Sequence, residues 1–171
     1  RWDLIPEDID IIIHTHLHND HCENDYKCVN AAIYAHAAEL ERIHQPHPLD
    51  YRYVEDFIED VEAKGQLRVV ADDRTICPGI AVMHTPAHTP GGISVLVATD
   101  QGQAAITGFC VIDENFNPPQ AVRAMEMEVI PPGTPTDPCR AYDIMLDLKA
   151  RADVLIPLHE PRFAAMDTVT R

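Results

Sequence analysis

The chain has 171 residues, enough for one domain with a sizeable hydrophobic core. Its 28 acidic and 13 basic side chains give a net charge of −15, which argues against nucleic acid or an anionic membrane surface as a partner. No stretch approaches the ~20 apolar residues that a transmembrane helix needs. We therefore expect a globular protein that does not bind membranes.

The first expected element is a strand over residues 9–13, a run rich in isoleucine that is typical of a buried strand. It ends directly before residues 14–21, His-Thr-His-Leu-His-Asn-Asp-His. A short strand over residues 31–36 and a helix over residues 37–43 follow. Two prolines at residues 44–48 then predict a loop, whose histidines we expect to be exposed rather than metal-bound.

An amphipathic helix is predicted over residues 50–63, because its apolar residues recur at spacings of three and four. Asp50 is its expected N-cap and Gly65 its end, and its acidic outer face is expected to be solvated. The period then changes to that of β-strands, separated by turn residues. The expected strands cover residues 67–71, 80–84, 93–98 and 103–107.

The C-terminal part begins with a proline-rich stretch over residues 113–137, where we expect an extended loop. Asp137 is the predicted N-cap of a helix that runs to about Arg151. A last strand over residues 154–158 leads directly to His159.

The histidine cluster after the first strand predicts a metal site. Histidine is polar and costs free energy when it is buried without a partner, so four imidazoles in eight positions are a poor choice for packing. Together with an aspartate they supply nitrogen and oxygen donors that suit Zn²⁺, although iron or manganese are alternatives. A strand end is also a rigid place to build a site.

Residues 16–21 closely resemble the His-x-His-x-Asp-His signature of the metallo-β-lactamase fold superfamily. The resemblance implies an α/β fold, an αββα sandwich, and two metal sites. It places His16 and His18 at the first site, and Asp20 and His21 at the second. His14 lies outside the signature, and we interpret it either as structural or as a residue that supports the ligands.

Two further segments resemble later motifs of the family. Thr85-Pro86-Ala87-His88-Thr89-Pro90-Gly91 differs from the family's turn only at Ala87, which implies that His88 is the third ligand of the first site. The strand end at residues 156–161 resembles the closing motif, which implies that His159 completes the second site. Three protein ligands per metal would leave an open coordination position, as catalytic sites do.

One departure from the family concerns the carboxylate that normally bridges both metals. Phe109 stands where the family has this aspartate, and phenylalanine cannot bind a metal. Cys110 is a candidate substitute, but an offset of one residue turns its side chain to the other face of a strand unless a bulge intervenes. We therefore predict that the second metal is bound more weakly, without a bridging carboxylate.

The resemblance implies a hydrolase in which a metal-bound hydroxide attacks an ester, lactone or thioester, with Asp20 as the catalytic residue that orients it and passes a proton to the leaving group. Acyl-homoserine lactonases are the more similar branch, and glyoxalase-II-like thioesterases are the nearest enzymatic alternative. The lactonases carry a tyrosine where this chain has Val111 and Ile112. A non-catalytic, incompletely metallated binding protein is the alternative from a different class.

The cysteines and the N-terminal sequence bear on location and assembly. The five cysteines are odd in number and irregularly spaced, so they predict reduced thiols in a cytoplasmic protein rather than disulfides. No basic-then-apolar signal segment precedes the motif. Because the family places several strands ahead of its signature, we expect a single domain over residues 1–171 that lacks its N-terminal strands. An open sheet edge would then favour a homo-oligomer.

Overall fold

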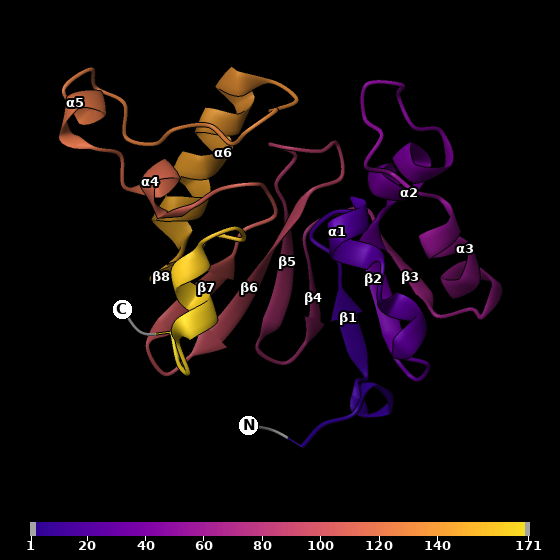
Figure 1. Ribbon diagram of the computed structural model, residues 1–171. Coiled ribbons are helices and arrows are strands. Elements are labelled where there is room, and N and C mark those ends of the chain that lie inside the picture. Colours follow the sequence, from indigo (N-terminus) through magenta and orange to yellow (C-terminus); the bar gives the residue numbers. More distant parts are fainter. Residues whose placement is uncertain (1–2, 170–171) are drawn as a thin grey trace. The chain divides into compact units, whose positions relative to one another are not determined.

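The computed structural model describes residues 3–169 and divides the chain into two compact units. The first unit extends to Ala71 and the second begins at Asp72 (Figure 1). Each contains one β-sheet and several helices, which confirms the predicted α/β class. Among the described residues, no helix is both long and apolar enough to cross a membrane.

The sheet of the first unit consists of parallel strands. The order is β1 (Ile11–Ile13), β2 (Ala32–His36), β3 (Leu67–Val70), with β2 in the centre. All three strands were predicted, but a fully buried first strand is wrong. Ile11 is 38% exposed, and among residues 3–169 β1 pairs with β2 alone.

Parallel neighbours need crossover connections, and helices supply them here. The connection from β1 to β2 contains α1 (Asn19–Cys22) and the 3₁₀ turn η2 (Asp25–Lys27), and η1 (Pro6–Asp8) precedes β1. Helices α2 (Ala37–His44) and α3 (Asp56–Ala63) connect β2 to β3. Their apolar sides and the sheet enclose the core of this unit, which includes Leu17, Ile33, Ile43, Ile58 and Val61.

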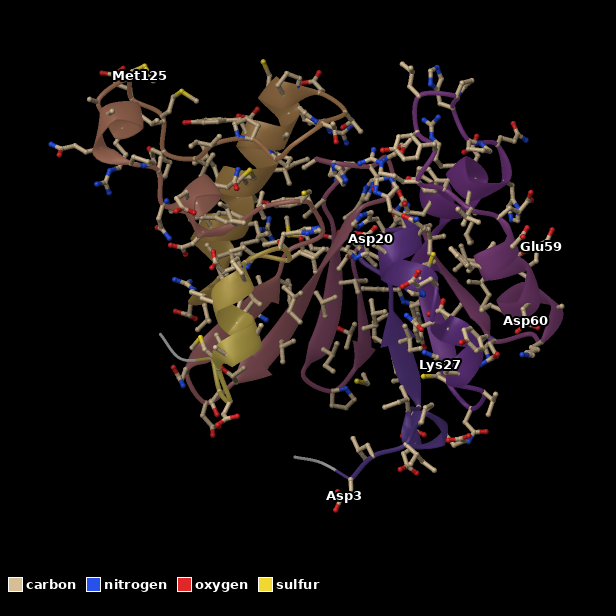
Figure 2. All side chains as sticks on the ribbon, viewed as in Figure 1. Asp3, Asp20, Lys27, Glu59, Asp60 and Met125 are labelled. Atoms are coloured by element: carbon tan, nitrogen blue, oxygen red, sulfur yellow. The ribbon has the colours of Figure 1, made fainter. Side chains whose placement is uncertain are left out.

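The helix predicted over residues 50–63 is wrong in its first half. It begins only at Asp56, with Glu55 rather than Asp50 as its N-cap, and Tyr51 is 84% exposed. Asp50, Arg52 and Tyr53 instead contact the histidine motif, and these contacts outweigh the helical period of the sequence. The remainder agrees with the prediction: Glu59 and Asp60 project from the outer face of α3 (Figure 2), and the chain turns at Gly65 with a φ of +68°.

The sheet of the second unit runs in chain order. Its strands are β4 (Arg74–Cys77), β5 (Ile80–His84), β6 (Ile93–Thr99), β7 (Gly102–Ile106) and β8 (Val154–Ile156). The strands from β4 to β7 pair antiparallel, whereas β8 pairs parallel to β7. The sequence failed to predict β4, a short edge strand whose first two residues are exposed and whose pairing contains a β-bulge.

The long helix of this unit is α6 (Pro138–Arg151), which connects β7 to β8. Its predicted cap is confirmed, since the Asp137 carboxylate accepts a hydrogen bond from the Arg140 amide at 2.9 Å. The extended loop predicted over residues 113–137 is wrong in part, because it contains α4 (Asp113–Phe116) and α5 (Gln120–Arg123). The 3₁₀ turn η3 (Pro161–Ala165) follows β8.

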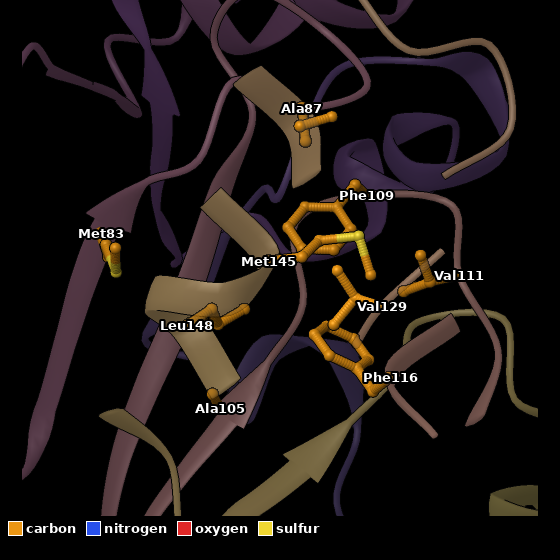
Figure 3. Close-up of a cluster of buried hydrophobic side chains, with 10 residues drawn as sticks. Met83, Ala87, Ala105, Phe109, Val111, Phe116, Val129, Met145 and Leu148 are labelled. Atoms are coloured by element: carbon orange, nitrogen blue, oxygen red, sulfur yellow. The ribbon is translucent and has the colours of Figure 1, made fainter. Parts of the chain in front are cut away.

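Helix α6 covers one face of the sheet and forms a hydrophobic core with it (Figure 3). The core takes side chains from the strands, from α6 and from the segments between β7 and α6. Its largest members include Phe109, Phe116, Met145 and Leu148. This packing fixes the ends of β5 and β8, after which the second unit's candidate ligands follow.

Candidate metal centre

The first unit gathers its candidate ligands in the turn that follows β1. His16 and His18 are buried, and their rings meet edge to face with centroids 4.7 Å apart. The ring centroids of His21 and His16 lie 4.1 Å apart, and the Nε2 atom of His21 is 3.4 Å from Asp20 Oδ2. Asp20 is on α1 (Figure 2), with 60% of its side chain exposed. The turn thus concentrates three imidazoles and a carboxylate.

Hydrogen bonds determine which nitrogen two of the candidate histidines present. His18 Nε2 lies 3.3 Å from Asp50 Oδ2, and because an ionised carboxylate only accepts, this nitrogen carries the proton and Nδ1 carries the lone pair. The reverse holds for His88 in the second unit. Its Nδ1 donates to the Gly133 carbonyl at 2.9 Å, so Nε2 carries the lone pair.

His14 is held apart from the motif histidines by its own partner. Its Nε2 lies 2.6 Å from Asp25 Oδ2, and both side chains are buried. The His14 amide also donates to the Tyr34 carbonyl at 2.9 Å and so extends the contact between β1 and β2. These contacts agree with a structural role for His14.

A buried glutamate supports the motif from α2. Glu39 is 0% exposed, and its Oε2 accepts hydrogen bonds from the Leu17 amide and the Tyr53 hydroxyl, both at 2.9 Å. Hydrogen bonds to a charged group stabilise by about 1.5–3 kcal/mol each. The Tyr53 ring in turn packs against His18, with centroids 4.7 Å apart. Leu17, which lies between His16 and His18, is therefore held in place through its backbone amide.

Sequence reasoning missed these supporting residues. One signal was available: Glu39 lies four residues before the buried Ile43, so a charged side chain occupies the apolar face of α2. No comparable signal marked Asp50 or Tyr53, since both lie in an irregular segment that was assigned to a helix. Burial opposes ionisation of Asp50, but Arg52 and His18 outweigh it and lower the pKa of the carboxyl.

Cys22, next to His21, is a buried packing residue of the same turn. Its Sγ lies 3.5 Å from the His18 carbonyl oxygen and 3.7 Å from that of Leu17. Burial, with nearby carboxylates, raises the pKa of the thiol to about 12. Cys22 is therefore a neutral thiol, whereas a cysteine that binds a metal does so as a thiolate.

The second unit contributes His88 and His159, each just beyond a strand end. His88 is buried in the turn between β5 and β6, which is closed by a hydrogen bond from the Thr85 amide to the Gly92 carbonyl at 2.7 Å. His159 is exposed, and its amide donates to the Val111 carbonyl at 3.0 Å.

His44, which is the last residue of α2 and not in the predicted loop, and His47, in the loop that follows, are not part of either ligand group. His44 lies between Glu55 and Glu62, with its two nitrogens 2.7 and 3.1 Å from their carboxylate oxygens. His47 Nδ1 accepts a hydrogen bond from the Leu49 amide at 3.1 Å. Their surface role was expected from the two prolines of this loop.

Phe109 is part of the hydrophobic core and offers no metal donor. It is 0% exposed, and its ring centroid lies 6.1 Å from that of Phe116 (Figure 3). The neighbouring Cys110 is half-buried and is not disulfide-bonded. The position of the expected bridging carboxylate is thus occupied by a packed aromatic ring.

The donor set of the first unit fits Zn²⁺. Neutral imidazole nitrogens and one carboxylate oxygen are ligands that zinc prefers, and a carboxylate behind a ligating histidine is a common arrangement at zinc sites. His16 and His18 are buried with their rings edge to face, and Thr15 Oγ1 lies 3.2 Å from His16 Nδ1. His18 Nδ1 is the ring nitrogen opposite the one that faces Asp50, and its lone pair is of the kind that binds Zn²⁺.

Comparison with known proteins identifies the superfamily of the chain. The family model of the Metallo-beta-lactamase superfamily matches residues 1–108. An N-acyl homoserine lactonase from a Bacillus species is 30% identical over 97 residues, which cover 56% of this chain and 36% of the lactonase. The chain thus spans about a third of the length of this relative.

Solved structures extend the likeness to nearly the whole chain. AiiA of B. thuringiensis, solved as a mutant with N-decanoyl-L-homoserine bound at its active site, has a TM-score of 0.73 and 24% identity. The match covers 98% of this chain and 62% of AiiA. The hydrolase AbOPH of the beta lactamase superfamily has a TM-score of 0.61 and 22% identity, over 85% of this chain and 54% of its own. These matches confirm the predicted fold.

Proposed function

Because the chain belongs to the metallo-beta-lactamase superfamily, we propose that it is a metal-dependent hydrolase that cleaves an ester, lactone or thioester of a small acyl substrate. The observation that carries the proposal is the packing of the His16, His18 and His21 rings beside Asp20 in one turn. Clustered imidazoles at the end of a strand are the arrangement from which catalytic zinc sites are built.

The proposed ligands are those that the resemblance to the superfamily implies. His16, His18 and His88 would hold one zinc ion, and Asp20, His21 and His159 a second. The donor chemistry supports the first set, since His18 Nδ1 and His88 Nε2 both carry lone pairs. Cys110 remains a candidate for the second set, for which Phe109 supplies no oxygen. We expect that the second ion is bound less tightly than the first.

When bound, the metals would acidify a water molecule and polarise the substrate carbonyl. The remaining work falls to side chains of this chain. Asp20, exposed beside His21, would orient the attacking water through a carboxylate oxygen and transfer a proton to the leaving oxygen or sulfur. Glu39 and Tyr53 would hold the motif in place, so that the buried imidazoles need not reorganise during the reaction.

For the substrate, we favour a lactone over a thioester. Support comes from the Bacillus lactonase, 30% identical over the matched residues, and from AiiA, whose structure contains N-decanoyl-L-homoserine. The position of the lactonases' tyrosine is occupied by Val111, which is buried in the hydrophobic core. Catalysis by this chain would therefore proceed without a phenol group at that position.

The test combines metal analysis with a substrate panel. Purified protein is loaded with zinc, its metal content is measured, and hydrolysis of acyl-homoserine lactones, thioesters and β-lactams is followed. Asp20→Ala should abolish turnover while the first metal stays bound, and Asp60→Asn, on the exposed face of α3, should behave as wild type. Full activity of Asp20→Ala would refute the role of Asp20, and a protein that binds no metal would refute the hydrolase.

Phe109 favours one alternative function. An aromatic ring in the apolar core, where a metal-bridging carboxylate is expected, suits a protein that holds one metal and binds acyl compounds without cleaving them. One tightly bound zinc per chain, together with binding but no hydrolysis of any substrate in the panel, would support this alternative.

A further inference from the structure

We propose that Asp50 is a positioning residue of the metal centre, which orients the His18 ring so that Nδ1 faces the metal and increases the basicity of that nitrogen. The inference rests on the proposed function, because it takes His18 as a ligand. The observation behind it is a polar contact between residues 32 positions apart, from His18 Nε2 to Asp50 Oδ2 at 3.3 Å.

The segment around Asp50 docks on the motif at several points. The Asn19 amide donates to the Arg52 carbonyl at 2.8 Å, and the Tyr53 ring packs on His18 with centroids 4.7 Å apart. Arg52 Nε donates to Asp50 Oδ1 at 2.8 Å, so one carboxylate oxygen is held by Arg52 and the other faces His18. The carboxylate is thus fixed from behind as well as directed toward the imidazole.

A ligating histidine usually donates its second ring N–H to a carboxylate or a carbonyl, which selects the tautomer and the ring orientation. Asp50 satisfies that description for His18, as the Gly133 carbonyl does for His88. The difference is that Asp50 is charged, and a negative charge on the far side of the imidazole makes the lone-pair nitrogen a better donor to a cation.

A simpler role for Asp50 is an ion pair with Arg52, in which both side chains are half-buried. Ion pairs near the protein surface contribute little. Such a pair would leave His18 free to adopt either tautomer and would not alter the affinity for a metal. The two roles therefore differ in what happens to His18, and not in what happens to the fold.

The experiment compares zinc-free wild-type protein with Asp50→Asn, Asp50→Glu and the control Asp56→Asn, whose carboxylate is exposed at the first residue of α3. Zinc affinity is measured by competition with a chelating dye, and the His18 tautomer by ¹⁵N NMR of the metal-free proteins. Asparagine keeps the size of the side chain but removes its charge. Thermal unfolding of each zinc-free variant verifies that the fold is kept.

We expect Asp50→Asn to weaken zinc binding by about 10–100-fold and to reduce the Nε2–H tautomer of His18. Asp50→Glu should recover part of the affinity, and Asp56→Asn should match wild type. Zinc affinity of Asp50→Asn within twofold of wild type, with an unchanged tautomer, would overturn the inference while the proposed function stands. Failure of the wild type to bind zinc would overturn the proposed function, and the tautomer would still decide whether Asp50 orients His18.

Discussion

The role of Phe109 can be tested by truncating its side chain. Phe109 is fully buried among Phe116, Val129 and Met145, so Phe109→Ala leaves a cavity that these neighbours fill only in part. Buried Phe→Ala substitutions cost about 3–5 kcal/mol in the free energy of unfolding. Because 1 kcal/mol shifts the Tm of a protein of this size by about 2–4 °C, we expect a decrease in Tm of roughly 6–20 °C.

The assay is thermal and urea-induced unfolding of the zinc-free proteins, with Met125→Ala as the control. Met125 is a large apolar side chain on the surface, and its truncation should change the stability by less than about 0.5 kcal/mol. A loss below about 1 kcal/mol for Phe109→Ala would refute the packing argument. Phe109→Asp should be worse than Phe109→Ala, because it buries a carboxylate without a partner. Recovery of wild-type stability by Phe109→Asp on addition of zinc would show that the position faces the metals.

Two further predictions concern the scaffold of each unit. In the first unit, the hydrogen bond that His44 donates to the Glu55 carboxylate, together with Glu62, raises the pKa of His44 above its ordinary value of 6.5. The stability that protonated His44 contributes should therefore be complete below about pH 6 and be lost as the pH rises through the raised pKa. His44→Gln should lower the free energy of unfolding, measured in urea, at pH 6 but not at pH 9. An equal loss at both pH values would contradict this prediction. In the second unit, a Cβ at Gly108 would lie 2.1 Å from a backbone oxygen of β6, so Gly108→Ala should lower the free energy of unfolding by about 1–3 kcal/mol or more. The control is Gly133→Ala, where no atom lies within 4 Å of the added Cβ, and its stability in the same assay should be nearly that of wild type. Equal stability of the two alanine variants would show that the backbone at Gly108 can shift.

The sequence predicted the strands and the ligand candidates because both are encoded by neighbouring residues. The isoleucine run before His14 and the apolar runs of β5, β6 and β7 have the local pattern of strands. The signature at residues 16–21 has fixed spacing, so it could be read without knowledge of the fold. The arrangement of the motif rings in one turn follows from that spacing.

The failures have a common physical cause, which is contact between distant residues. Residues 50–55 have a helical period, yet Asp50, Arg52 and Tyr53 contact the motif instead, and no local pattern records that choice. The edge strand β4 was missed because half of it is exposed and the sequence alternation is weak. Prolines at residues 113–137 suggested an extended loop, but one helical turn forms before Pro118 and another between Pro119 and Pro131.

Ligands and supporting residues of the centre therefore have different origins in the chain. The ligand candidates follow strands β1, β5 and β8, where backbone pairing fixes their starting points. The supports Glu39, Asp50 and Tyr53 come from the connection between β2 and β3, which has little regular structure around residues 45–55. Because a metal is bound more tightly when its ligands are oriented in advance, changes in this connection should alter zinc affinity without replacing any ligand. The signature at residues 16–21 accordingly indicates which atoms can bind zinc. The segment from α2 to α3 determines how far these atoms are already oriented before zinc binds.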